Sequence, residues 1–430
     1  MTKRAECDRI EEKTGKGDKR MKHLIGNAVV GQSGGPTAAI NATLAGVIRG
    51  VREGLAPIVR LYGMRNGIDG FLAERMIDLG AAVDTEDKLR LLEHTPAAAL
   101  GSCRRKLPDP AKEPAVYESL LALFRKYDIR YFFYIGGNDS MDTVSRLSAY
   151  LAGKDWEMRI IGVPKTIDND LMGTDHTPGF GSAAKYIAVT VQEILRDCAV
   201  YTVPAVTVVE IMGRDAGWLT ASAAAGGYVS GVFPDLIYLP ERDFSTERFL
   251  ADVRATLKKH PNVVVAVSEG IRSSDGRYIG EGAQSGAVDA FGHAYLAGAG
   301  KVLEQLIKSE LGCKVRSVEL NLPQRCAGHL ASATDLWEAV SVGRSAVEAA
   351  GRGVTGEMMS IDRTGEDPYT VGFGHSAIAE IANRVRQVDD RYINEAGNGM
   401  TDAFRSYILP LIRGEAETVW ESGIPKHLIL

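Results

Sequence analysis

Cysteine is scarce in this sequence, and its distribution excludes two structural classes. The chain of 430 residues carries five cysteines, an odd number, and no two of them form a CxxC pair. Structural zinc sites and disulfide frameworks both depend on regular cysteine spacing, so neither is indicated. Scattered, reduced thiols are typical of a reducing compartment, and we therefore predict a cytoplasmic protein.

Long apolar runs and an excess of positive charge are also missing. No segment reaches the ~18 uninterrupted apolar residues that a membrane-spanning helix needs, so no membrane partner is expected. The formal net charge is -5, whereas coating nucleic acid requires surplus lysine and arginine. An anionic small molecule stays possible as a ligand, because it needs only a local basic cluster.

The length suffices for two domains, and the pattern along the chain is of the α/β class. Residues 1–22 mix charges of both signs with almost no apolar side chains, which predicts a disordered tail. After it, one theme recurs: an apolar run, a turn bearing Gly or Asp, and a helical pattern. The predicted strands are 24–30, 131–135, 159–163, 205–211, 263–268 and 315–320.

Strands that alternate with helices predict mostly parallel sheets covered on both faces. In such folds ligands bind beyond the carboxyl ends of the strands, which is where the polar motifs of this chain lie. The segments 227–240 and 272–286 are predicted as loops, the second as a mobile surface loop because it is rich in Gly, Ser and Asp.

Two glycine-bearing motifs follow the first two of these strands. GQSGGPTAAIN begins at Gly31 and joins a strand to a helix, and IGGNDS (Ile135–Ser140) repeats the arrangement. Small residues let the backbone approach a ligand, and free amides at a helix start favour an anion. A tight turn, or helix capping by Asn138, Asp139 and Ser140, is the plainer alternative. Neither motif is a GxGxxG or Walker loop.

The segment PKTIDND (Pro164–Asp170) is the most informative. Lys165, Asp168 and Asp170 crowd into six residues directly after an apolar strand, although a turn needs at most one Asp. Phosphoryl transfer to an alcohol requires a carboxylate for the hydroxyl proton, cations for the phosphate charge and oxygen ligands for a metal. This motif offers all three, so we interpret it as a reaction centre.

Further candidate residues follow later strands. MGRDAGW places Arg214 just past a strand, and the planar donor fork of Arg suits phosphate, although a solvated surface Arg is the better interpretation in isolation. Glu269 ends an apolar strand, and Arg316 and Arg325 flank VELNLPQ. Each of these is a weaker indication when taken alone.

Taken together and in this order, SGGPTAAIN, LGSCR, IGGNDS, PKTIDND, MGR, SEG and the pair Arg316 and Arg325 resemble the phosphofructokinase family, from about residue 24 to about residue 375. The resemblance implies a fold of two Rossmann-like three-layer domains with a cleft between them. It also implies transfer of phosphate to the 1-hydroxyl of fructose 6-phosphate with Mg²⁺ as cofactor, in the cytoplasm and in glycolysis.

The resemblance further implies roles for individual residues. Asp168 matches the proton acceptor, Thr166 a neighbour that contacts substrate, Asp170 the second motif aspartate near the metal and phosphate, and Arg214 the transition-state arginine. Sugar-phosphate contacts are implied for Thr166, Asp168, Met212, Gly213, Arg214, Glu269 and Arg325. Donor-phosphate contacts are implied for Gly34, Gly35, Arg104, Gly137 and Asp139. Arg316 matches an arginine that reaches a neighbouring subunit's sugar phosphate, which implies a homodimer or homotetramer.

Two positions address the phosphate donor. ATP-dependent bacterial relatives carry glycine where this chain has Asp139, and a carboxylate there would crowd and repel the α-phosphate of a nucleotide. They also carry glycine where this chain has Lys165, which counts among the catalytic residues because its ammonium could pair with pyrophosphate. Members with both residues resemble the pyrophosphate-dependent branch, so we expect a pyrophosphate-dependent phosphofructokinase.

Three departures from the family pattern stand out. Asn138 replaces a common metal-binding aspartate, and its amide oxygen is the candidate ligand. Asn321 and Leu322 replace the usual aromatic or imidazole contact, and Ala205 replaces a subunit-bridging arginine. The alternatives are an ATP-dependent enzyme of the same family, a non-catalytic regulatory subunit and, more remotely, a Rossmann oxidoreductase.

The expected domains are discontinuous in the chain. Residues 23–179 and 326–375 are predicted to bind the phosphate donor. Residues 180–325 and 376–430 are predicted to bind the sugar phosphate, with the last segment packing on the smaller domain.

Overall fold

The computed structural model describes residues 24–281, 298–382 and 384–430. The predicted tail at 1–22 and the last part of the predicted loop at 272–286 lie outside these residues. Within the described part of that loop, Arg272 and Tyr278 form an isolated antiparallel bridge. In the part of the chain that the structure describes, no helix is both long and apolar enough to span a membrane.

The larger sheet has seven strands in the order β11-β10-β5-β4-β1-β2-β3. Neighbouring strands run parallel from β10 to β2, and the two edge strands β11 and β3 are antiparallel to their neighbours. The bounds are β1 Gly26–Gln32, β2 Ile58–Met64, β3 Met76–Asp78, β4 Ile129–Gly136, β5 Arg159–Pro164, β10 Glu357–Glu366 and β11 Tyr369–Ala377.

Strand β4 shows why this sheet is covered on both sides. Side chains alternate across a strand, so Tyr131 and Phe133 enter one core while Phe132 and Tyr134 enter the other. The first core lies under α1 and α13, and the second under α5 and α6. The helices are α1 Ile40–Arg52, α2 Gly67–Leu72, α3 Leu79–Ala82, α4 Glu86–Glu93, α5 Pro114–Lys126, α6 Asn138–Ala152 and α13 Ala333–Gly351.

The smaller sheet has four parallel strands in the order β7-β8-β6-β9. Strand β6 sends Val206 and Val208 to one core and Val209 and Ile211 to another. The strands are β6 Ala205–Ile211, β7 Leu236–Tyr238, β8 Asn262–Ser268 and β9 Lys314–Glu319. The helices are α7 Phe180–Cys198, α8 Trp218–Ala221, η1 Ser222–Ala224, α9 Gly227–Ser230, α10 Thr246–Leu257, α11 Ala299–Leu311, α12 Pro323–Cys326 and η3 Gly328–Leu330.

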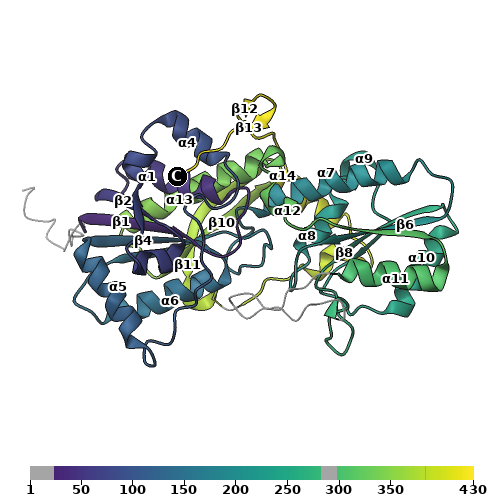
Figure 1. Cartoon of the computed structure of the whole chain (residues 1–430), viewed down its shortest axis with the longest axis horizontal. Coiled ribbons are helices and arrows are strands. Elements are labelled where there is room, and N and C mark those ends of the chain that lie inside the picture. The colour runs from purple at the N-terminus through teal and green to yellow at the C-terminus, as the bar shows by residue number, and fades with distance from the viewer. Residues whose placement is uncertain (1–23, 282–297, 383) are drawn as a thin grey trace, which may run out of the picture.

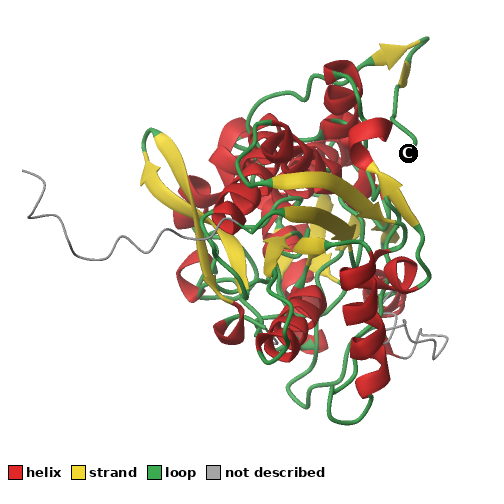
Figure 2. Ribbon diagram, turned by 90° about the vertical axis from the view of Figure 1, so that its left-hand side faces the viewer, coloured by secondary structure: helices red, strands yellow, loops and turns green. Residues whose placement is uncertain are grey.

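The two sheets form two lobes side by side, with α7, α12 and α14 (Ala403–Leu411) between them (Figure 1). In the end-on view of Figure 2, red helices lie on both sides of the yellow strands. Two three-layer α/β units with mostly parallel sheets are therefore present, as the sequence predicts. Two short strands, β12 Trp420–Glu421 and β13 Ile424–Pro425, and two short turns, η4 Ile378–Glu380 and η5 Asp390–Tyr392, complete the described elements.

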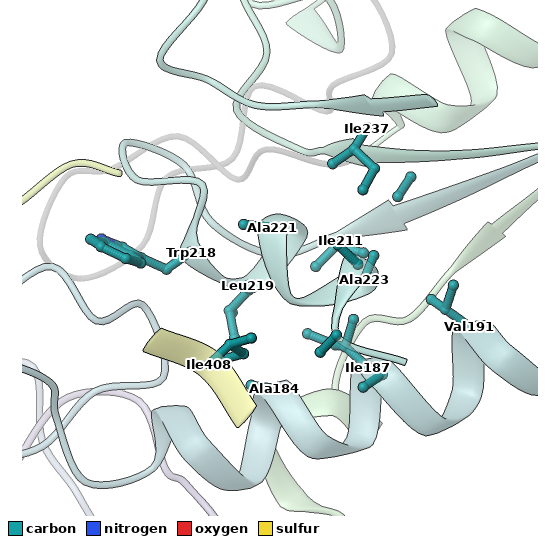
Figure 3. Close-up of a cluster of buried hydrophobic side chains, with 14 of the residues drawn as sticks. Ala184, Ile187, Val191, Ile211, Trp218, Leu219, Ala221, Ala223, Ile237 and Ile408 are labelled. Atoms are coloured by element: carbon teal, nitrogen blue, oxygen red, sulfur yellow. The ribbon is translucent and has the colours of Figure 1, made fainter. Parts of the chain in front are cut away.

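The C-terminal segment packs on the smaller sheet before it returns to the larger one. Ile408 of α14 contacts the core formed by α7 and α8, where it lies near Leu219 and Ala184 (Figure 3). Further along, Leu428 and Leu430 pack against the core under α1 and α13. The assignment of this segment to the sugar-phosphate-binding domain stays a prediction, as do the other domain boundaries.

The sequence-based strand predictions hold with small shifts in their bounds. Strand β6 has the predicted limits, and β4, β5, β8 and β9 differ by one or two residues at their ends. Strand β1 begins two residues later than predicted and continues through Gly31 and Gln32. The prediction of a loop at 227–240 was wrong, since this segment contains α9 and the buried strand β7.

Candidate active site

A cavity of about 480 Å³ opens where the carboxyl ends of strands from both sheets face each other. Its lining brings together segments that follow β1, β4, β5, β6 and β8, as expected for a site beyond the strand ends. The lining residues are Gly34, Gly35, Pro36, Thr37, Arg104, Lys106, Gly137, Asn138, Asp139, Ser140, Lys165, Thr166, Ile167, Asp168, Asp170, Met212, Arg214, Asp215, Ala216, Glu269, Arg325 and Val385.

One wall of the cavity is formed by the loop after β1 and the side chain of Lys165. Gly34 has a positive φ of 78°, which suits glycine, and a Cβ there would lie 3.3 Å from the Lys165 Nζ. The Lys165 ammonium is buried and donates a hydrogen bond to the Gly35 carbonyl oxygen at 2.8 Å. Burial lowers the pKa of Lys165 to about 8. This wall therefore presents a buried, weakly hydrated cation.

More positive charge surrounds Lys165. The positive charges of Arg104 and Arg325 add to the lowering of its pKa, which shows that they are near. A Cβ on Gly35 would lie 3.6 Å from the Nη1 of Arg325. Both arginines line the cavity. A cluster of one lysine and two arginines around a glycine loop is suited to a polyanion such as a diphosphate.

Helix α6 points its first turn at the same space. Gly137 is the N-cap residue, and within the described residues no side chain caps the helix there. The carboxylate of Asp139, in that first turn, forms an ion pair with Lys106 at 3.0 Å. The Asp139 side chain retains 24% of its exposure and the Lys106 side chain 48%, so both remain open to the cavity. Asp139 is thus a charged wall of the donor region, balanced by a lysine.

The PKTIDND motif forms the floor. Asp168 and Asp170 line the cavity, and the Asp168 Oδ2 accepts a hydrogen bond from the Thr166 hydroxyl at 3.2 Å. Burial raises the pKa of Asp168. Burial, followed by the charge of Asp168, raises the pKa of Asp170 to about 7. Two half-buried carboxylates that repel each other favour the binding of a cation between or beside them.

Asn138 contacts one of these carboxylates through its side-chain amide. Its Nδ2 donates to the Asp170 Oδ2 at 3.2 Å, whereas its buried Oδ1 has no hydrogen-bond partner among the residues that the structure describes. An orphaned buried amide oxygen requires an explanation, and a cation or water ligand would provide one. The described residues contain no group of three or more His, Cys, Asp and Glu that could hold a metal ion.

The opposite wall comes from the smaller sheet. Gly213 has a positive φ of 127° and donates its backbone N–H to the Glu269 Oε1 at 3.2 Å. The backbone N–H of Met212 donates to the Gln324 Oε1 at 3.2 Å. Burial raises the pKa of Glu269 to about 8, so this carboxyl group is largely protonated at neutral pH. Arg214 lines the cavity beside it.

The structure thus brings together the predicted site residues with two exceptions. Arg316 lies on β9 with an exposed side chain outside the cavity, and Gly213 contacts Glu269 without lining the cavity itself. Sequence reasoning missed Thr37, Lys106, Asp215 and Val385, which also line the cavity. Lys106 lies two residues after the LGSCR motif, which ends at Arg104. That proximity is the signal that could have identified it.

Comparisons with known proteins agree with this geometry. The phosphofructokinase family model matches residues 27–350. The pyrophosphate–fructose 6-phosphate 1-phosphotransferase of Halomonas elongata is 43% identical over 404 residues, covering 93% of this chain and 95% of that protein. A sulfofructose kinase of Alkalicoccus urumqiensis is 31% identical over 368 residues, covering 85% of this chain and 91% of that protein.

A solved structure leads to the same family. The crystal structure of the pyrophosphate-dependent phosphofructokinase from Nitrosospira multiformis aligns with a TM-score of 0.85 at 38% identity, covering 94% of this chain and 96% of that one. The family model spans well over half of the chain, and the relatives span nearly all of it. The chain therefore belongs to the phosphofructokinase family.

Proposed function

We propose that this protein transfers a phosphoryl group from pyrophosphate to the 1-hydroxyl of fructose 6-phosphate, giving fructose 1,6-bisphosphate and phosphate. The observation that carries the proposal is one cavity that joins two half-buried carboxylates, Asp168 and Asp170, to a basic wall and to the carboxylate of Asp139. The names of the Halomonas and Nitrosospira relatives support the same donor. The reaction is expected to be reversible.

The proposed chemical step begins with a proton transfer. Asp168 removes the proton from the 1-hydroxyl of the sugar as that oxygen attacks the near phosphorus of pyrophosphate. The bond from this phosphorus to the bridging oxygen breaks, and phosphate leaves with the electron pair. A raised pKa makes Asp168 a better base than an ordinary aspartate. Thr166, which donates to its Oδ2, orients the carboxylate.

The basic residues of the cavity are assigned to stabilising the negative charge of the phosphates. Lys165, Arg104 and Arg325 surround the glycine loop and are assigned to the phosphates, with Gly34, Gly35 and Gly137 giving close backbone approach. Arg214 is assigned to the phosphoryl group in transit, because it lines the cavity near Asp168. Its positive charge opposes part of the rise in the pKa of Asp168 that burial causes. Met212, Gly213 and Glu269 are assigned to the sugar phosphate.

A divalent cation, which we propose to be Mg²⁺, fits the oxygen-rich floor. Asp170 and the orphaned Oδ1 of Asn138 would hold it, directly or through water, which leaves Asp168 available as the base. When bound, the ion neutralises phosphate charge and helps align the donor. Two carboxylates with raised pKa values at one place are favourable for such an ion, because it relieves their mutual repulsion.

Asp139 is the proposed basis of donor choice. It lies in the first turn of α6, where the α-phosphate of a nucleotide would have to approach, and the pair with Lys106 holds its carboxylate in the donor region. Pyrophosphate has no nucleoside and avoids this contact. For Arg316 we keep the assignment to a neighbouring subunit's sugar phosphate, in a cytoplasmic homodimer or homotetramer, which agrees with its exposed position on β9.

The test is a donor comparison. The purified chain is incubated with Mg²⁺, fructose 6-phosphate and either pyrophosphate or ATP, and fructose 1,6-bisphosphate is measured. We expect turnover with pyrophosphate and far less with ATP. Equal or better turnover with ATP would establish the ATP-dependent alternative, and binding of fructose 1,6-bisphosphate without turnover would indicate a regulatory subunit. A third reaction with sulfofructose as acceptor tests the specificity that one relative's name suggests.

A further inference from the structure

Asn169 separates Asp168 from Asp170 in the chain, and hydrogen bonds hold both the oxygen and the nitrogen of its side-chain amide. It is fully buried and has a positive φ of 55°, a backbone conformation that non-glycine residues adopt uncommonly. Its Oδ1 accepts the Thr177 backbone N–H at 3.1 Å, and its Nδ2 donates to the Tyr407 hydroxyl at 2.7 Å. The directions of Asp168 and Asp170 therefore depend on what holds Asn169.

Tyr407 comes from α14, 238 residues further along the chain. Its hydroxyl accepts from Asn169 and donates to the Asp175 carbonyl oxygen at 3.0 Å. It also accepts two longer hydrogen bonds of 3.5 Å from the Nη1 and Nη2 of Arg386. Its ring packs near those of Trp218, at 5.0 Å between centroids, and Tyr392, at 5.7 Å. The core around Trp218 and Ile408 that Figure 3 shows thus anchors this hydroxyl.

A second contact from the same part of the chain holds the other side of Asn169. The backbone N–H of Arg386 donates to the Asp170 carbonyl oxygen at 2.8 Å, and the Arg386 carbonyl oxygen accepts from the Trp218 Nε1 at 3.1 Å. The Arg386 guanidinium lies 4.4 Å from the centroid of the Trp218 ring and 5.8 Å from that of Tyr407. Residues of the smaller lobe and the C-terminal segment therefore fix a loop of the larger lobe.

We propose that Tyr407 is a positioning residue for phosphoryl transfer, because its hydroxyl holds Asn169 and thereby fixes the relative directions of the Asp168 and Asp170 carboxylates. This inference rests on the proposed function. Tyr407 touches neither substrate nor metal in this assignment. It acts chiefly through Asn169, which its hydroxyl contacts at 2.7 Å, whereas its contacts with Arg386 are longer, at 3.5 Å. A displacement of about 1 Å in a catalytic group can lower the rate ~100-fold without altering substrate contacts.

The test removes one hydroxyl and compares it with another from the same core. Tyr407→Phe deletes the hydrogen bond from Asn169 together with the hydroxyl's bonds to the Asp175 carbonyl oxygen and the Arg386 guanidinium, and the Asn169 variant below isolates the first of these. Tyr392→Phe is the matched control, because Tyr392 is buried in the same cluster but its hydroxyl, within the described residues, accepts only from the Arg391 Nη2, at 2.9 Å. For both variants kcat, both KM values, the melting temperature and the pH profile of kcat are measured in the full chain.

We expect Tyr407→Phe to lower kcat about tenfold or more, with both KM values within about twofold of wild type and a shifted pH profile. Tyr392→Phe should leave kcat and the pH profile unchanged. If the two variants lose stability but keep wild-type kcat and pH profile, Tyr407 is only a structural residue and the proposal is overturned. Equal falls of kcat in both variants would overturn it as well.

A second variant tests the same contact in case Tyr407→Phe folds poorly. Asn169→Gly relieves the positive φ and removes the amide, so its kcat should fall as in Tyr407→Phe. The kcat of the double variant should be no lower than that of Asn169→Gly alone, since both substitutions break the hydrogen bond between Asn169 and Tyr407. Additive falls would contradict the proposal. A wild-type chain that is inactive with pyrophosphate would instead overturn the proposed function, and the positioning role would fall with it.

Discussion

The ammonium of Lys165 donates a hydrogen bond to the carbonyl oxygen of Gly35 at 2.8 Å, across the wall that faces the phosphate donor. The side chain is 3% exposed, and burial lowers its pKa to about 8. A charged lysine held this way stabilises the fold poorly, because desolvation of an ammonium is costly. The same cation becomes useful when a diphosphate arrives and supplies the missing negative charge.

Replacing Lys165 with Met is therefore expected to weaken the binding of pyrophosphate without lowering the stability of the ligand-free fold. The KM for pyrophosphate should rise tenfold or more, which corresponds to about 1.4 kcal/mol. Without ligand the variant should be at least as stable as wild type at pH 7, since a pKa of about 8 against 10.5 in the unfolded chain costs roughly 3 kcal/mol below pH 8. The wild-type protein regains this stability as the pH rises from 8 to 10.5, because the folded state then loses the buried charge. The difference in free energy of unfolding between Lys165→Met and wild type should therefore shrink over this range.

Lys185 provides the control for Lys165→Met. It is also buried, at 6% exposure, and its Nζ donates to the Gly414 carbonyl oxygen at 2.7 Å, away from the cavity. Lys185→Met should lose stability in thermal unfolding and keep the wild-type KM for pyrophosphate. An unchanged KM in Lys165→Met would remove this lysine from the donor site.

Asp139 is expected to select the donor by its charge and its volume, and two substitutions separate these effects. Asp139→Asn keeps the volume and removes the charge, whereas Asp139→Gly removes both. ATP use should rise in Asp139→Gly and rise less in Asp139→Asn, because the side chain still occupies the space of the α-phosphate. Steady-state kinetics with each donor measure this. If ATP stayed excluded and pyrophosphate use were unchanged in Asp139→Gly, the crowding argument would lose its support.

Lys106 is expected to moderate the charge of Asp139. The pair is partly exposed, so its contribution to stability is small, but its loss leaves a bare carboxylate beside an incoming polyanion. Lys106→Ala should raise the KM for pyrophosphate about threefold or more, and the effect should weaken at high salt. Arg105→Ala is the control, because Arg105 is the adjacent cation and its Nη1 pairs with the Asp69 Oδ1 at 3.0 Å outside the cavity. Equal effects of the two changes would argue for general surface charge.

The sequence predicts those parts of the site that follow directly from strands. Apolar runs such as 205–211 have the length and composition of buried strands, and the polar residues just beyond them must meet at one edge of a parallel sheet. Asp168, Arg214 and Glu269 could be placed in one site for this reason. Strand β7 escaped prediction because its three residues, Leu236–Tyr238, are too few to show a period beside Pro234.

Contacts between distant segments could not be predicted in the same way. Lys106 lies in a loop without regular structure, and its approach to Asp139 depends on how that loop crosses the sheet. Tyr407 carries no motif, and its contact with Asn169 depends on α14 packing between the two lobes. Such pairs are set by tertiary packing, which local propensity and periodicity do not encode.

Glu269 predicts a pH dependence of sugar binding. Burial raises the pKa of its carboxyl group to about 8, so the group is largely neutral at pH 7 and becomes charged above pH 8. The new negative charge should repel the sugar phosphate, and the KM for fructose 6-phosphate should rise between pH 7 and pH 9. Glu269→Gln mimics the neutral form and should keep a flat KM over this range. A parallel rise in both proteins would assign the effect to another group.

Asp168 is the residue on which turnover should depend most. Asp168→Asn keeps the size of the side chain and can still accept from the Thr166 hydroxyl, but it has no basic oxygen for the proton of the 1-hydroxyl. General-base catalysis is worth about 10²- to 10⁴-fold, so kcat should fall by that range or more. Because burial raises the pKa of Asp168, the neutral amide removes a desolvated charge, and the melting temperature should hold or rise. Near-normal kcat with a normal melting temperature would transfer the role of base to another group, and Asp170→Asn measured in parallel shows whether that group is its neighbour.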